Sequence, residues 1–130
     1  MREATLELLA PRTDVWAFLA EPFHLPDWWP GITGVEPDRR GFAPGARWKV
    51  HSTKRNIFTG TRSVETMLLI RDIEPYERWS WHVLEPTLDA EVRLRATAED
   101  RTEVTVVVSR GNPAVAVKRL YDLVQTAATL

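Results

Sequence analysis

The chain has 130 residues, of which 44% are hydrophobic and 27% are charged, and its 17 Lys and Arg nearly balance its 18 Asp and Glu. This length suits one domain over residues 1–130 that buries a core without cross-links. The lack of cysteine excludes disulfides, thiolate nucleophiles and Cys-based metal sites. The balanced charge argues against nucleic acid as a partner. Its apolar runs are too short for a membrane span, and its acidic start does not fit a secretory signal, so we expect a soluble, cytoplasmic domain.

The first thirty residues predict one strand and two short helices. Residues 3–9 alternate apolar and polar side chains, as in a half-buried strand. Pro11 suits the first position of a helix, and Asp14 complements the dipole of its first turn. A second short helix over residues 23–29 ends at Pro30-Gly31.

The middle of the chain is free of proline over long stretches and predicts antiparallel strands joined by short turns. The expected strands cover residues 46–50, 57–73, 78–85, 88–96 and 102–109. Lys54-Arg55-Asn56 is expected to form a hairpin turn, and Gly60 a bulge in the strand that follows. Asp89, Glu91, Arg93 and Arg95 alternate with apolar residues and are expected on a solvated sheet face.

The last segment predicts a helix of about 18 residues. Asn112 can cap it and Pro113 suits its first turn. The order of elements is one strand, two short helices, about six further strands and a long helix. Because one face of such a sheet is apolar, the terminal helix is the expected cover, and the fold class is α+β.

Four short motifs carry a resemblance to a known family. They are P-x-x-x-V-W-x-x-L from Pro11, W-W-P-G from Trp28, G-x-x-W from Gly45 and E-P-x-x-R-W from Glu74. Together with the element order, they resemble the START/Bet v 1-like (SRPBCC) superfamily and its polyketide cyclase/dehydrase-like branch. The resemblance implies a helix-grip fold, a curved antiparallel sheet of about seven strands wrapped on a long C-terminal helix. It also implies an apolar cavity for lipids, polyketides or aromatic metabolites.

Six tryptophans are the most informative residues. Trp48, Trp79 and Trp81 fall on the apolar faces of their strands, and each buries about 150–250 Å². Two interpretations are open: the rings line a ligand pocket, or they fill the core. Trp28 and Trp29 adjoin Pro30 at a helix end: either one packs inward and the other lies at the pocket mouth, or they simply anchor the turn. The predicted apolar lining is Trp48, Val50, Val64, Trp79, Trp81, Val83, Ala90, Val92, Leu120 and Val124.

Arg62 and Thr66 share one face of their expected strand with Val64. If that face points inward, both could hold a carboxylate, enolate or carbonyl oxygen of a ligand. A solvated Arg62 is the alternative, because residues 67–70 are all apolar and leave the strand's orientation ambiguous.

The remaining polar residues give no catalytic or metal motif. His51 and His82 are expected to face solvent and His24 to lie at the surface, and their spacing fits no metal site. We expect no cofactor. The leading hypothesis is binding of a small hydrophobic molecule, with a homodimer left open. The alternatives are a cyclase, aromatase or dehydratase acting on a polyketide-like substrate, and a protein-interaction module.

Overall fold

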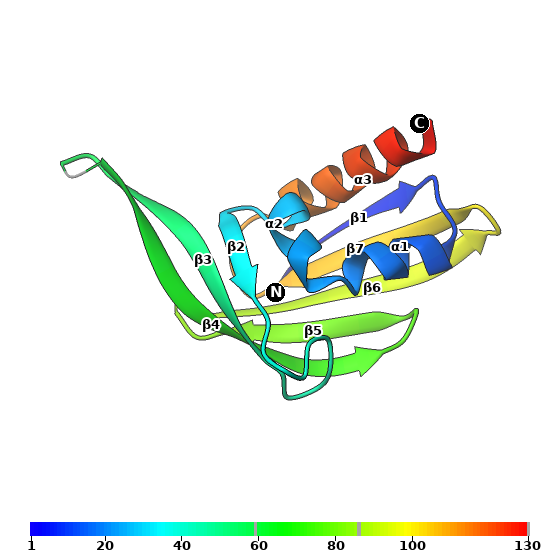
Figure 1. The fold of residues 1–130 in the computed structure, drawn as a ribbon. Coiled ribbons are helices and arrows are strands. Elements are labelled where there is room, and N and C mark those ends of the chain that lie inside the picture. Colours follow the sequence, from blue (N-terminus) through cyan, green and yellow to red (C-terminus); the bar gives the residue numbers. More distant parts are fainter. Residues whose placement is uncertain (59, 86, 130) are drawn as a thin grey trace.

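A seven-stranded antiparallel sheet with helices on one face makes up the computed structural model, which describes residues 1–58, 60–85 and 87–129 (Figure 1). Its strands follow the order β1-β7-β6-β5-β4-β3-β2. They are β1 (Arg2–Leu8), β2 (Ile32–Glu36), β3 (Arg47–Asn56), β4 (Gly60–Glu74), β5 (Arg78–Val83), β6 (Leu88–Ala98) and β7 (Arg101–Val108). The helical elements are α1 (Arg12–Leu19), the 3-10 turn η1 (Pro22–His24), α2 (Leu25–Trp28) and α3 (Pro113–Thr129). The predicted helix-grip architecture is confirmed.

The inner, helix-facing side of the sheet carries the alternating apolar residues. Trp79, Trp81 and Val83 of β5 are all buried. On β4, Leu68 and Ile70 are buried, and the register pairs Leu68 with Trp48 of β3. Since side chains two residues apart share a face, Arg62, Val64 and Thr66 also belong to the inner side of β4. The ambiguity of this strand is thereby removed.

The outer side of the sheet is a network of exposed ion pairs. Arg78 contacts Glu91 at 2.9 Å and Glu74 at 3.0 Å, which lowers the pKa of the Glu74 carboxyl. His82 contacts Asp89 at 2.8 Å. His51 contacts Glu36 at 2.7 Å. The predicted outward orientation of both histidines and of the charged β6 residues is therefore confirmed.

The hairpin between β3 and β4 differs from the sequence prediction. The turn expected at Lys54-Arg55-Asn56 is wrong, because β3 continues through Asn56, which pairs with Gly60. Gly60 is also not a bulge: it begins β4 with a φ of +79°, a backbone conformation that glycine adopts readily. The irregularity in β4 lies between Ile70 and Asp72 instead. The hairpin is longer than expected and extends away from the body of the molecule (Figure 1).

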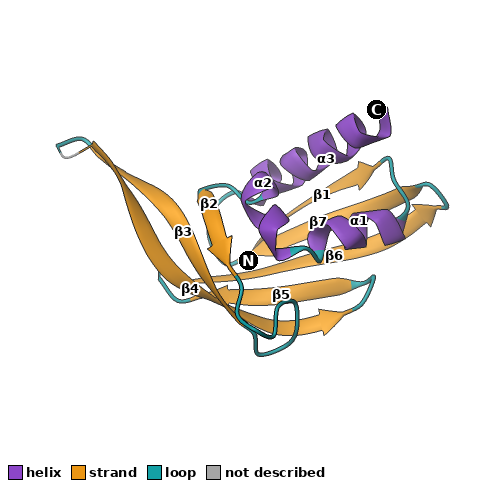
Figure 2. Cartoon of the chain, viewed as in Figure 1, coloured by secondary structure: helices purple, strands orange, loops and turns teal. Residues whose placement is uncertain are grey.

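The helices divide the inner side of the sheet among them (Figure 2). The terminal helix α3 contacts β1, β7 and α2, whereas α1 contacts β6 and β7. Asn112 caps α3 as predicted, its side-chain oxygen accepting a hydrogen bond of 3.1 Å from the Ala114 N–H. The cover predicted for α3 alone is thus shared with the shorter helices. No helix within the described ranges is long and apolar enough to cross a membrane.

Candidate ligand-binding site

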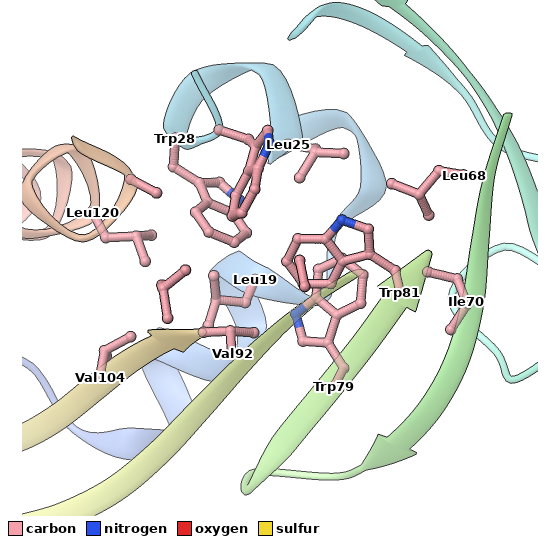
Figure 3. Packing of buried hydrophobic residues seen from close by; sticks show 14 of the residues in the cluster. Leu19, Leu25, Trp28, Leu68, Ile70, Trp79, Trp81, Val92, Val104 and Leu120 are labelled. Atoms are coloured by element: carbon pink, nitrogen blue, oxygen red, sulfur yellow. The ribbon is translucent and has the colours of Figure 1, made fainter. Parts of the chain in front are cut away.

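All six tryptophans belong to one chain of ring contacts, which we call the aromatic cluster. Its centre is the stacked pair Trp79 and Trp81 on β5, with ring centroids 4.2 Å apart (Figure 3). Around this pair, the contacts run from Trp81 to Trp28 and Trp29, from Trp79 to Trp48 and Phe42, and from Phe42 to Trp16. The cluster joins residues from β3, β5, both short helices and the loop before β3.

The centre of this cluster is tightly closed. Trp28, Trp48, Trp79 and Trp81 are each at most 1% exposed. The predicted lining residues that the structure brings into the same buried core are Trp48, Val50, Trp79, Trp81, Val83, Ala90, Val92 and Leu120. The rings therefore fill the core, as one of the two sequence interpretations proposed, and a ligand among them must separate rings that are in contact.

The loop over residues 37–46 closes the cluster on the β3 side. The Trp48 indole N–H donates a hydrogen bond of 2.7 Å to the Gly41 carbonyl. The Asp38 carboxylate holds the loop's base by accepting hydrogen bonds from the backbone N–H groups of Arg47, at 2.9 Å, and Arg40, at 3.0 Å. These bonds favour the ionised form and hold the pKa of Asp38 below its ordinary value.

The inner face remains open beyond the cluster, where the β3–β4 hairpin leaves the body of the molecule. A hollow of about 710 Å³ lies there, which we call the mouth. It is lined by Ser52, Thr53, Arg62, Val64, Glu65, Glu85, Thr87 and Arg110. Thr66 borders it less directly: its hydroxyl oxygen accepts a hydrogen bond of 3.1 Å from the Glu85 N–H and ties β4 to the turn after β5.

Two arginines with few partners line the mouth, together with two glutamates, Glu65 and Glu85. Arg62 is exposed and makes no hydrogen bond or ion pair within the described part of the chain. Arg110 makes a single long hydrogen bond of 3.5 Å to the Thr87 carbonyl. By contrast, Arg78, Arg93 and Arg95 on the outer side are all paired with glutamates. The mouth arginines are thus available to an anionic or carbonyl oxygen.

A second, smaller hollow lies beside the mouth and is lined by one ring of the aromatic cluster. It measures about 150 Å³ and shares Arg110 with the mouth. Trp29 lines it, is 8% exposed, and meets the Trp81 ring edge-on at 5.1 Å. Trp28 is 1% exposed, so both rings are buried, and Trp29 lies at the smaller hollow and not at the mouth. Trp29 therefore lies between this smaller hollow and the buried Trp79–Trp81 pair.

The predicted site residue Val124 packs at the edge of the core, away from the mouth. Val124 lines a hollow of about 390 Å³ between α1 and α3, together with Phe18, Leu123 and neighbours in the segment before α1. Arg110 and Phe42 were not predicted. Both lie in loops, where the sequence has no periodic pattern that would indicate which way a side chain points. The one sequence signal for Arg110 is its position just before the residue that caps α3, and the one for Phe42 is the neighbouring Gly41.

The interior offers no acid–base group among the residues that can be described. Thr102 is the single buried polar side chain there, and its hydroxyl donates to the Ala10 carbonyl at 2.8 Å. His24 stacks on Phe18 with ring centroids 4.2 Å apart, and its Nδ1 lies 2.8 Å from the Phe18 carbonyl. The arrangement can therefore stack on a planar molecule and hold an oxygen at the mouth.

Comparison with known proteins agrees with this arrangement. A family model described as "Polyketide cyclase / dehydrase and lipid transport" matches residues 3–128. The chain belongs to this family. A comparison with curated protein sequences finds no match.

Similar solved structures show that this chain has the Bet v 1-like fold. A Deinococcus radiodurans protein is 19% identical, with a TM-score of 0.74 and coverage of 98% of both chains. Ara h 8.0201 is 14% identical, with a TM-score of 0.67 and coverage of 96% of this chain and 97% of that one. StfQ, a di-domain ARO/CYC protein of the steffimycin biosynthetic pathway, is 16% identical, with a TM-score of 0.72 over 99% of this chain and 46% of StfQ. At these identities the likeness establishes the fold alone.

Proposed function

We propose that this protein binds a small hydrophobic or aromatic molecule at the mouth and against the aromatic cluster behind it. The observation that carries the proposal is the position of Trp29, which touches the buried Trp81 ring at 5.1 Å and lines open space on its other side. A ligand that extends from the mouth past Arg110, which lines both hollows, would therefore meet the Trp29 ring. Membership in a family of cyclases, dehydrases and lipid transport proteins supports the same conclusion.

The physical basis of binding is burial of apolar surface, with orientation from a few polar groups. Each Å² of apolar surface removed from water contributes about 25 cal/mol. The mouth volume of about 710 Å³ lies in the range of small-molecule sites, about 300–1,000 Å³. Because the rings behind it are in contact, the ligand replaces ring–ring contacts with ring–ligand contacts, and side-chain rotations of this kind are common on binding.

Tryptophan fluorescence tests the proposal directly, because the whole cluster is made of indoles. We expect a panel of fatty acids, flat aromatic ketones and naphthalene dyes to include members that change the emission at micromolar concentration. Val64→Trp would narrow the mouth and should weaken this response. Val115→Trp is the matched control, since Val115 is 41% exposed on α3 and is not among the residues that line the mouth. Silence from the whole panel would contradict the proposal.

A cyclase or dehydratase activity on a polyketide-like substrate is the second candidate, favoured by Arg62 at the mouth, which has no ion-pair partner in the described part of the chain. A guanidinium there would stabilise an enolate oxygen of a bound substrate. Arg62→Ala separates the two candidates. Under the enzyme hypothesis it abolishes turnover of a polyketone substrate, whereas under the binding hypothesis it only changes affinity.

A further inference from the structure

Two indole N–H groups at the centre of the aromatic cluster find no hydrogen-bond acceptor among the described residues. The Nε1 atoms of Trp79 and Trp81 are buried and contact no acceptor in the described ranges of the chain. Each side chain is 1% exposed, so bulk solvent does not reach them either. Trp48 is as deeply buried, yet its N–H is satisfied by the Gly41 carbonyl at 2.7 Å. The difference therefore lies in the partners and not in the depth of burial.

Leaving such donors unpaired is costly and uncommon. Most buried polar groups in folded proteins have a partner, and those that lack one often mark a functional site. Here two of them lie on adjacent stacked rings of one strand. In Figure 3 the two nitrogens lie at different edges of the stacked pair, the Trp81 nitrogen on the side of Leu25 and Leu68. One oxygen atom is thus poorly placed to serve both.

A bound water is a poor partner in this interior. Buried waters make about three hydrogen bonds each and need several polar neighbours. Among the residues whose burial is described, Thr102 is the only buried polar side chain, and its hydroxyl is already used by the Ala10 carbonyl. The rings around the pair belong to Trp28, Trp29, Trp48 and Phe42. An apolar body that carries its own acceptor fits these surroundings better.

We propose that the stacked pair Trp79 and Trp81 selects ligands that carry a carbonyl or phenolic oxygen on an aromatic skeleton, with one of the two indole N–H groups donating a hydrogen bond to that oxygen. This rests on the proposed function and narrows it, because a pure hydrocarbon or an alkyl chain satisfies neither donor. Trp81 is the nearer of the two to the hollow beside the mouth, since its ring contacts Trp29, which lines that hollow.

A pair of shape-matched probes isolates the hydrogen bond. 2-Acetylnaphthalene and 2-isopropenylnaphthalene differ in that a carbonyl oxygen replaces a methylene group. By isothermal titration, we expect the ketone to bind the wild-type protein about tenfold more tightly, the effect of one hydrogen bond in an apolar site. Trp81→Phe, or Trp79→Phe if that donor is the one used, should remove the preference. Trp48→Phe is the control and keeps it, because its N–H already serves Gly41.

A measurement on the unmodified protein covers the case in which a variant does not fold. In ¹⁵N-labelled protein, the indole N–H signal of Trp79 or Trp81 should move downfield when the ketone is added, and that of Trp48 should stay. Equal binding of both probes by the wild type overturns the inference and leaves the proposed function intact. So does a ketone preference that survives in both Phe variants, or magnetisation transfer from a bound water to either indole. If neither probe binds, while other panel members do, the selection for oxygen is wrong; if nothing binds, the proposed function fails with it.

Discussion

The two ends of the inner sheet face differ in how tightly their side chains are packed. At the β5 end, Trp79 and Trp81 are 1% exposed and are surrounded by other rings. At the hairpin end, Val64 is half-buried and Arg62 is exposed at the mouth without a partner in the described ranges. One strand, β4, runs through both ends, so the difference does not come from the backbone. From this difference we expect the ring cluster to contribute most to stability. The side chains at the mouth are less packed and can contact a ligand.

The largest effect is expected from removing a ring at the centre of the cluster. Trp79→Ala deletes a side chain that contacts Phe42, Trp48 and Trp81. Large-to-small changes of this kind cost about 3–5 kcal/mol in the free energy of unfolding, because the cavity collapses only in part. Urea unfolding followed by circular dichroism measures it. Arg62→Ala at the other end should lie within about 0.5 kcal/mol of the wild type. Similar losses for the two variants would show that the ends do not differ.

A finer comparison separates two equally buried tryptophans. Trp48→Phe and Trp81→Phe remove the same atoms, but only the first breaks a hydrogen bond and leaves the Gly41 carbonyl without its donor. We therefore expect Trp48→Phe to be the more destabilising variant by about 1–3 kcal/mol. Denaturant unfolding of both proteins, with no ligand added, gives the difference. A larger loss for Trp81→Phe would mean that its indole N–H has a partner in the free protein.

The sequence predicts the ring-filled end much better than the mouth, and the reason is physical. Alternation along β5 and β6 follows from burial of one face, so the positions of Trp79, Trp81 and Val92 could be inferred from period two alone. The mouth depends on where the hairpin turns and on loops that lack any period. The turn was placed at Lys54-Arg55-Asn56 because those residues are polar, yet β3 continues through Asn56.

For the aromatic cluster, the sequence predicts the orientation of the rings but not how they pack. That Trp48, Trp79 and Trp81 face inward follows from the pattern, but whether they enclose a space or fill it depends on three-dimensional packing. Phe42 decides part of this by contacting both Trp48 and Trp79, and nothing in its loop sequence marks it as buried. The short strand β2 was likewise not located, since its pairing with β3 includes an irregularity at Ile32 and Gly34.

Acid should loosen the loop that closes the cluster. The pKa of Asp38 is held below its ordinary value of 3.8, chiefly by the Arg47 N–H. A lowered pKa in the folded state means that the stabilisation is complete above 3.8 and is lost as the pH falls through the folded value. Asp38→Asn should thus be less stable than the wild type at about pH 7, and the difference should shrink at about pH 3. Urea unfolding of both proteins at each pH measures this. If the difference in unfolding free energy between the two proteins is the same at both pH values, the effect comes from the shape of the loop and not from the charge of Asp38.

The smallest effect is expected at the mouth, on affinity. Among the described residues no carboxylate pairs with Arg62, although Glu65 and Glu85 line the same hollow and weaken its field. Arg62→Gln should therefore weaken binding of 2-naphthoate by only about threefold to fivefold, an exposed charge interaction worth about 1 kcal/mol or less. Binding of neutral 2-acetylnaphthalene should stay unchanged. Arg93→Gln, on the outer side and paired with Glu91 at 2.7 Å, is the matched control and should alter neither. The effect of Arg62→Gln should fade as salt is raised, because exposed charges are screened. A loss that persists at high salt would instead place the guanidinium in a desolvated contact with the ligand, and would move the recognition site from the mouth toward the rings.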